Sequence, residues 1–120
     1  MAIAAALKAG EDPSALLPRG YRGSQSGLSK QAAPDLIAKA PIGAELRLAI
    51  EPNDRRDKDE VRVNIDLPDG STANLGYLPA DEAFIRALER GWVRCWFAAR
   101  RPTLRHELGA AIVFTAIHDP

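Results

Sequence analysis

Residues 45 to 79 read ELRLAIEPNDRRDKDEVRVNIDLPDGSTANLGYLP and contain the clearest periodic pattern of the chain. Leu46, Leu48 and Ile50 alternate with polar or small residues, which is the period of a strand with one buried face. A second alternation of the same kind follows, in Val61, Val63, Ile65 and Leu67. The two patterns predict a pair of antiparallel strands joined by the long charged connection Glu51–Glu60, in which Glu51-Pro52 ends the first strand.

The pattern continues after this hairpin. A Pro-Asp-Gly turn at residues 68–70 and the segment Ser71–Leu75 predict a third strand. Asp81 is the expected N-cap of a helix that Gly91 ends. Two more alternating segments, Trp92–Ala99 and Gly109–Ile117, predict closing strands. Strands dominate and none needs a parallel crossover, so we expect a mainly β, β-rich α+β fold: a small antiparallel OB-like barrel with one or two helices.

The first 41 residues have a weaker pattern. Glycine and proline around Tyr21 predict a loop or a poorly formed strand, and Ser29–Lys39 predicts a helix with Leu36 and Ile37 pointing inward. We therefore divide the chain into an N-terminal extension, residues 1–41, which packs on the barrel, and a barrel domain, residues 42–120.

Composition limits the class of protein. At 120 residues the chain has the length of one domain, and its 16 basic and 16 acidic side chains cancel. The neutral total hides a local excess, because six arginines and one acid lie between Arg86 and Arg105. The single cysteine, Cys95, falls on an apolar strand face and indicates a buried thiol in a reducing compartment. No apolar run approaches the ~20 residues of a membrane helix, so we expect a soluble, cytoplasmic protein.

Few residues are arranged for catalysis. The acidic residues between Asp54 and Glu60 are interleaved with basic ones, which favours a solvated, self-compensating loop over a cation site. The two histidines, His106 and His118, lie outside metal-ligand spacings and are interpreted as surface residues. We therefore expect a non-enzymatic protein without a metal or cofactor.

The strongest chemical indication is the combination of arginine and tryptophan in the last third of the chain. Arg86 and Arg90 lie one helical turn apart, and Arg94 shares a predicted strand face with Trp92 and Trp96. Arginine on phosphate and indole beneath a base suit single-stranded nucleic acid. The alternative is that the tryptophans pack into the core or beneath the N-terminal segment, with the arginines on a solvated rim.

One ordered set of residues spans Ile42 to Gly91. A glycine precedes a strand, an acidic-proline pair and a charged loop with an aspartate follow, and a Val-rich strand leads to a Gly-Tyr-hydrophobic-Pro exit into a helix. The members are Gly43, Leu46, Leu48, Glu51, Pro52, Asp57, Val61, Val63, Gly70, Gly76, Tyr77, Leu78 and Pro79. In this order they resemble the HIRAN domain, found in some helicase-like DNA repair proteins and as a stand-alone module in bacteria.

The resemblance implies an OB-like barrel that captures DNA ends, particularly single-stranded 3′ ends, through an aromatic-aspartate pair in the charged loop. Asp57 stands at the aspartate position, while Arg56 replaces the aromatic residue, so the stacking ring is lost there. Tyr77 belongs to the exit motif, and Tyr21 and Arg22 are the candidates for an upstream aromatic-basic contact. The expected nucleic-acid-binding set is completed by Arg86, Arg90 and Arg94.

Three functions follow as hypotheses. The first is a DNA-binding module for single strands or ends. The second is a protein-interaction module, or a small subunit of a nucleic-acid-processing or defence complex, that docks a partner through the loop Asp54–Glu60. The third is a metal-dependent hydrolase built on the same loop, although the loop has neither the ligand spacing nor the turn glycine of a calcium site.

Overall fold

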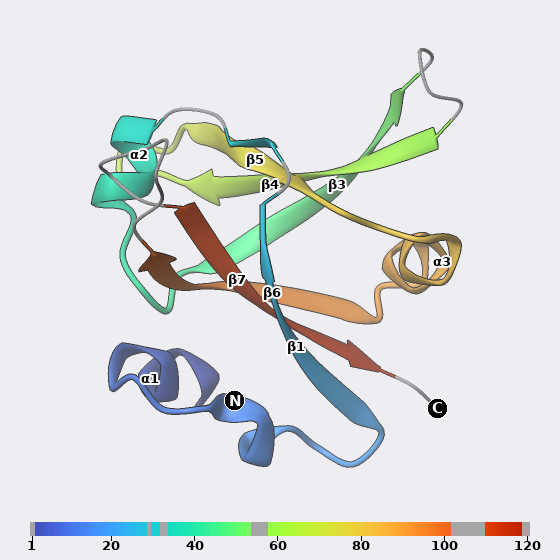
Figure 1. Ribbon diagram of the computed structural model, residues 1–120, viewed down its shortest axis with the longest axis horizontal. Helices are drawn as coiled ribbons and strands as arrows, with labels where there is room; N and C mark the ends of the chain where they lie inside the picture. Colours follow the sequence, from blue (N-terminus) through green and yellow to red (C-terminus); the bar gives the residue numbers. More distant parts are fainter. Residues whose placement is uncertain (1, 29, 32–33, 54–57, 102–109, 119–120) are drawn as a thin grey trace.

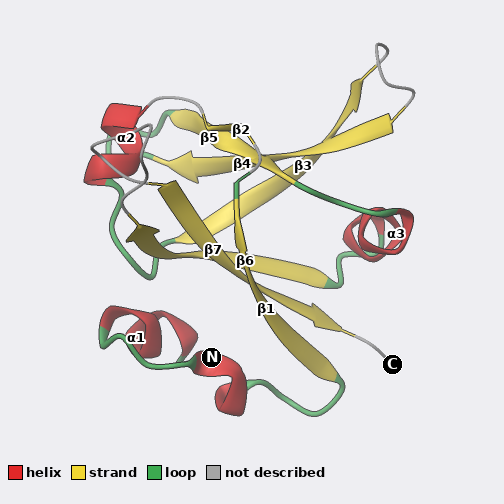
Figure 2. Ribbon diagram, in the orientation of Figure 1, coloured by secondary structure: helices red, strands yellow, loops and turns green. Residues whose placement is uncertain are grey.

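The computed structural model of the chain describes residues 2–28, 30–31, 34–53, 58–101 and 110–118. Antiparallel strands make up most of it, with short helices at the periphery (Figures 1 and 2), which confirms the expected β-rich α+β fold. The strands are β1 (Tyr21–Gly27), β2 (Lys30–Gln31), β3 (Glu45–Asn53), β4 (Lys58–Asp66), β5 (Thr72–Leu78), β6 (Val93–Arg101) and β7 (Ala110–His118). The helices are α1 (Ile3–Lys8), the 3-10 helix η1 (Pro13–Leu16), α2 (Pro34–Lys39) and α3 (Glu82–Glu89). None of these described helices is long and apolar enough to cross a membrane.

The strands form one sheet in the order β1-β7-β6-β3-β4-β5-β2, so β1 and β2 are its two edges. β1 stays on β7 as far as Leu28, whose N–H donates to the Ala111 carbonyl, and Lys30 already lies opposite Tyr77 of β5. Because two residues span only about 7 Å, the sheet curls until its two edges meet at this point. β1 and β2, from the predicted N-terminal extension, thus contribute strands to the same sheet as β3 to β7.

The main core lies inside the curled sheet. Its fully buried side chains include Val61 of β4, Leu75 of β5, Phe97 of β6 and Val113 of β7, and Ile37 of α2 packs against them. Burial of a side chain of this size stabilises the folded state by roughly 1.5 to 3 kcal/mol. The alternating residues of the predicted strands thus meet in one cluster, as their period requires.

Strand β6 is buried on both faces. Cys95 and Phe97 face the main core, and burial raises the pKa of the Cys95 thiol well above its ordinary range, in agreement with the predicted buried thiol. Trp96 is 3% exposed and packs with Phe114 and Ile3 of α1 in a second cluster. The alternative interpretation of the sequence, a tryptophan beneath the N-terminal segment, is therefore confirmed for Trp96.

Strand β3 runs past Glu51-Pro52 to Asn53, so the predicted end of this strand is wrong. Pro52 lies opposite Asp59 of β4, while the recorded pairing of β3 with β6 stops at Leu46. The outer half of β3 therefore has a partner on one side, and proline is tolerated at such an edge because its missing N–H need not face a neighbour. Together with β4, this half forms an arm that projects from the body of the molecule (Figure 1).

Strand β1 is a complete strand, where the sequence predicts a loop or a poorly formed strand. Its sequence, YRGSQSG, has a low intrinsic preference for strands, so its pairing with β7 imposes the conformation. A Cβ at Gly23 would lie 2.5 Å from Cζ of Phe114. Glycine at this position allows the strand to lie directly against the Phe114 ring.

Helix α2 is fastened to the sheet by Arg100 of β6. Nε of Arg100 donates to the Ile37 carbonyl at 2.7 Å, and its terminal nitrogen donates to the Ala40 carbonyl. The guanidinium also lies 5.1 Å from the centroid of the Phe97 ring. Because the last carbonyls of a helix have no intrahelical partner, Arg100 satisfies groups that would otherwise depend on water.

Replacement of Arg100 by methionine tests this role. The variant keeps an apolar stem but leaves the carbonyls of Ile37 and Ala40 without their donors, so we expect the free energy of unfolding to fall by about 1 to 3 kcal/mol. Denaturant unfolding followed by tryptophan fluorescence measures the change. Arg47→Met is the control, with an expected loss below about 1 kcal/mol, since Arg47 makes an exposed ion pair. Equal losses in the two variants would contradict the anchoring role.

Candidate nucleic-acid interface

A groove of about 230 Å³ lies beside α3. Figure 1 shows that β1 and β6 begin, and β7 ends, near this helix. Its lining residues are Arg22, Ala83, Arg86, Ala87, Arg90, Trp92, Ile117 and His118, and we call it the basic groove. Three of the arginines predicted to bind nucleic acid, Arg22, Arg86 and Arg90, come together here. They belong to β1 and to α3 with its C-cap, which are distant in the sequence.

Helix α3 presents its arginines to the groove because its apolar residues face the core. Oδ1 of Asp81 accepts a hydrogen bond from the Phe84 N–H at 2.8 Å, which confirms the predicted N-cap. Ala87 is buried and the Phe84 ring packs against the main core. Arg86 and Arg90, one turn apart, therefore remain exposed at the wall of the groove.

The C-terminal end of α3 places Trp92 beside Arg90. Gly91 has a φ of +74°, a conformation that favours glycine. The Gly91 N–H donates to the Leu88 carbonyl at 3.0 Å and the Trp92 N–H donates to the Ala87 carbonyl at 2.9 Å, which is the bonding pattern of a Schellman motif. The chain reverses within this turn, and Cζ of Arg90 lies 5.0 Å from the Trp92 ring centroid.

Three half-buried rings form a row next to these arginines. The backbone N–H of His118 donates to the Trp92 carbonyl at 2.9 Å, which ties the end of β7 to the start of β6. The His118 ring centroid is 5.8 Å from that of Trp92, edge to face at 88°, and 4.9 Å from that of Tyr21. The row Tyr21–His118–Trp92 thus combines aromatic surface with the cation of Arg90.

The charge of the basic groove is positive. None of the described residues that line it is acidic. Arg86 forms an ion pair with Glu82 at 3.7 Å, and because the two side chains are 67% and 90% exposed, the pair contributes little. An adjoining hollow of about 200 Å³ shares Arg22 and Ile117 with the groove, and Asp81 is one of its lining residues.

Arg94, also predicted to bind, lies in an ion pair outside the groove lining. Its Nη2 and Nε donate to the Glu45 carboxylate at 2.7 and 3.0 Å, and these hydrogen bonds raise the pKa of Arg94. Its guanidinium lies 4.9 Å from the centroid of the buried Trp96 ring. The three residues therefore do not form one binding surface. Trp92 lines the groove, whereas Arg94 and Trp96 lie outside its lining.

The residues implied by the HIRAN resemblance occupy a different part of the chain. Arg56 and Asp57 lie outside the described residues. Tyr77 is half-buried on β5, where its hydroxyl donates to Oε2 of Glu51 at 3.2 Å, and it lies opposite Arg62 of β4. Tyr77 does not line the basic groove, so the structure separates it from Arg22, Arg86 and Arg90.

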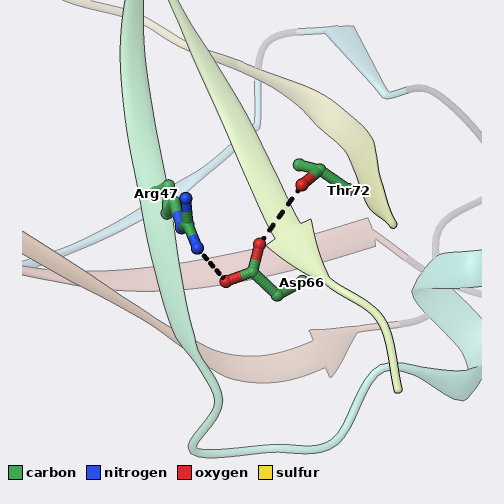
Figure 3. A network of polar contacts seen from close by, with 3 residues as sticks. All are labelled: Arg47, Asp66 and Thr72. Atoms are coloured by element: carbon green, nitrogen blue, oxygen red, sulfur yellow. Dashed lines mark hydrogen bonds and ion pairs between the residues drawn. The ribbon is translucent and has the colours of Figure 1, made fainter. Parts of the chain in front are cut away.

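On β3 and β4, Arg47, Arg62 and Asp66 each contact a neighbouring side chain, and Figure 3 shows the contacts of Asp66. Nη2 of Arg47 donates to Oδ2 of Asp66 at 2.7 Å, and the Thr72 hydroxyl donates to Oδ1 of the same carboxylate at 3.3 Å. Nε of Arg62 donates to the Asn64 side-chain oxygen at 3.0 Å. These internal contacts make this surface a poorer anion site than the basic groove.

His118 is the groove residue that the sequence did not indicate. The sequence favours a surface histidine at this position, whereas the His118 ring contacts Tyr21 and Trp92. These contacts depend on the order β1-β7-β6, in which Tyr21 lies opposite His118. No local spacing contains this information, because the partners are far apart in the chain.

Across the described part of the chain, no group of three or more His, Cys, Asp or Glu is placed to hold a metal ion. The acidic loop considered for a cation falls largely outside that part. Comparisons of the chain with protein-family models, with curated proteins and with solved structures find no match.

Proposed function

We propose that this chain is a non-enzymatic, HIRAN-like module that binds single-stranded nucleic acid in the basic groove. The observation that carries the proposal is the convergence of Arg22, Arg86 and Arg90 around Trp92. Guanidinium groups bind phosphate oxygens, often with two parallel hydrogen bonds, and an indole provides a surface for a base. The resemblance to HIRAN domains supports DNA, and strands with free ends, as the first ligand to test.

The aromatic part of the groove favours a single strand over a duplex. Base faces in a duplex are covered by stacking, so an indole has a base to stack on only where the strand is unpaired. Arginines stand on both walls, Arg22 on β1 and Arg86 with Arg90 on α3 and its end. A strand laid along the groove would meet cations on both sides.

Arg86→Gln tests the electrostatic part of the proposal. We expect about a three- to tenfold weaker Kd for a labelled single-stranded oligonucleotide, because one charge-assisted phosphate contact is lost. The slope of log K against log salt should become shallower by about 0.7, the contribution of one phosphate contact on a single strand. Fluorescence anisotropy at several salt concentrations measures both quantities.

Arg47→Gln is the matched control for this experiment. Arg47 and Arg86 are similarly exposed, at 71% and 67%, and each makes one surface ion pair. We expect Arg47→Gln to leave Kd and salt slope unchanged. Equal weakening by the two variants would show that binding follows net charge rather than the basic groove, and absence of binding by the unmodified chain at low salt would refute the proposal.

Trp92 provides an intrinsic probe of base stacking. In a Trp96→Phe background the remaining tryptophan fluorescence comes from Trp92, and we expect single-stranded DNA to quench it. Trp92→Ala should weaken binding by about 1 to 3 kcal/mol, the usual contribution of one base stacked on an aromatic ring. In the converse background, Trp92→Phe, the buried Trp96 should report no quenching. Quenching of Trp96 alone would place the ligand elsewhere.

The open edge of β1 favours a second candidate function, the binding of a protein strand. The Tyr21 N–H donates to the Pro18 carbonyl at 3.1 Å, whereas the Leu28 N–H donates to β7. Since N–H groups alternate sides along a strand, those of Gly23 and Gln25 point away from β7. Such an edge is a template for a strand of another chain.

Gln25→Pro distinguishes this second candidate. The substitution removes an N–H from the open edge without removing a hydrogen bond to β7. If the chain is a protein-interaction module, a partner should co-purify after nuclease treatment, Gln25→Pro should lose it, and Arg86→Gln should retain it. A partner that is lost on nuclease treatment alone would instead support nucleic-acid binding.

A further inference from the structure

We propose that His118 is a phosphate-contacting residue of the basic groove that acts only in its protonated form, so that nucleic-acid binding tightens as the pH falls. This inference rests on the proposed function of the groove. It assigns a role to a residue that neither the periodic pattern nor the HIRAN resemblance indicates. It also makes the interface responsive to pH.

The position of the imidazole supports this role. His118 lines the groove together with Arg22, Arg86 and Arg90, and its ring lies 4.9 Å from the Tyr21 ring and 5.8 Å from the Trp92 ring. These rings hold the imidazole at the wall of the groove. In the described part of the structure, its side-chain contacts are these aromatic ones, and no carboxylate pairs with it.

The groove residues around His118 include three cations, whose charge a bound anion would offset. Arg22 approaches from β1, and Arg86 and Arg90 approach from α3 and its C-cap. Among the acidic groups on the neighbouring elements, Glu82 pairs with Arg86, and Glu45 of β3 pairs with Arg94 of β6. The Asp81 carboxylate caps α3, and Glu89 of the same helix is exposed. Asp119 follows in the sequence and lies outside the described residues.

A phosphate in this setting would favour the imidazolium form of His118. Opposite charge within a few ångströms stabilises the charged state of a titratable group, and aromatic faces accept a cation. Binding would therefore take up a proton. The extra contact is therefore gained as the pH falls and lost as the pH rises.

The experiment measures the Kd of a labelled oligothymidine between pH 5.5 and 8.0 at constant ionic strength. For the unmodified chain we expect about five- to tenfold tighter binding at pH 5.5 than at pH 8.0, from one added charge contact near the surface. His118→Gln, which stays neutral, should bind with little pH dependence and with the affinity that the unmodified chain has at pH 8.0. His118→Lys, which stays charged, should bind tightly at both ends of the range.

His106→Gln is the control, since His106 is the other histidine of the sequence and should not affect the pH profile. A pH dependence that survives in His118→Gln would overturn the inference, and so would a pH-independent Kd of the unmodified chain, while either result leaves the proposed function standing. No binding at any pH would overturn both. If His118→Gln unfolds, His118→Asn, which also stays neutral, takes its place in this comparison.

Discussion

The short link between the two edges of the sheet is the constraint on which the remaining structure depends. β1 ends on β7, and β2, which begins at Lys30, pairs with β5 at the opposite edge. The sheet has to curl to satisfy both pairings, and the curl encloses Phe97 and Leu75 in one core. The same curl leaves the start of β1 facing α3, where Arg22 meets the arginines of that helix. The basic groove is therefore a consequence of how the sheet curls.

Several of the described arginines have structural roles, while others line the basic groove. Arg100 satisfies the end of α2, Arg94 is held by Glu45, and Arg47 is paired with Asp66, so these side chains contribute to the architecture. Arg22, Arg86 and Arg90 line the basic groove together with Trp92, and none of the described lining residues is acidic. A chain with a formal net charge of zero thus presents a local positive site.

Features that depend on nearby residues could be predicted from the sequence. The cap at Asp81, the reversal at Gly91 and the alternation of the central strands each require only neighbours within one or two turns. Arg86 and Arg90 were likewise predicted as a pair from helical spacing. Their positions in the structure agree with this local information.

Features that depend on distant partners could not be predicted. β1 is a strand because β7 lies beside it, and Pro52 stays within β3 because the strand has a partner on one side there. Trp96 is buried because α1 covers it. The ring contacts of His118 depend on the same strand order. The residue types of the site could thus be predicted from the sequence, whereas their contacts depend on the strand order of the folded chain.

The most direct test of the account is a nuclear magnetic resonance titration of the isotope-labelled chain with a short single-stranded DNA. The account predicts that backbone amide shifts concentrate on residues 21–23, 83–92 and 117–118, which surround the basic groove. Amides around Arg47 and Tyr77 should remain unchanged. Shifts confined to the arm of β3 and β4 and to Tyr77, or spread evenly over the surface, would contradict it.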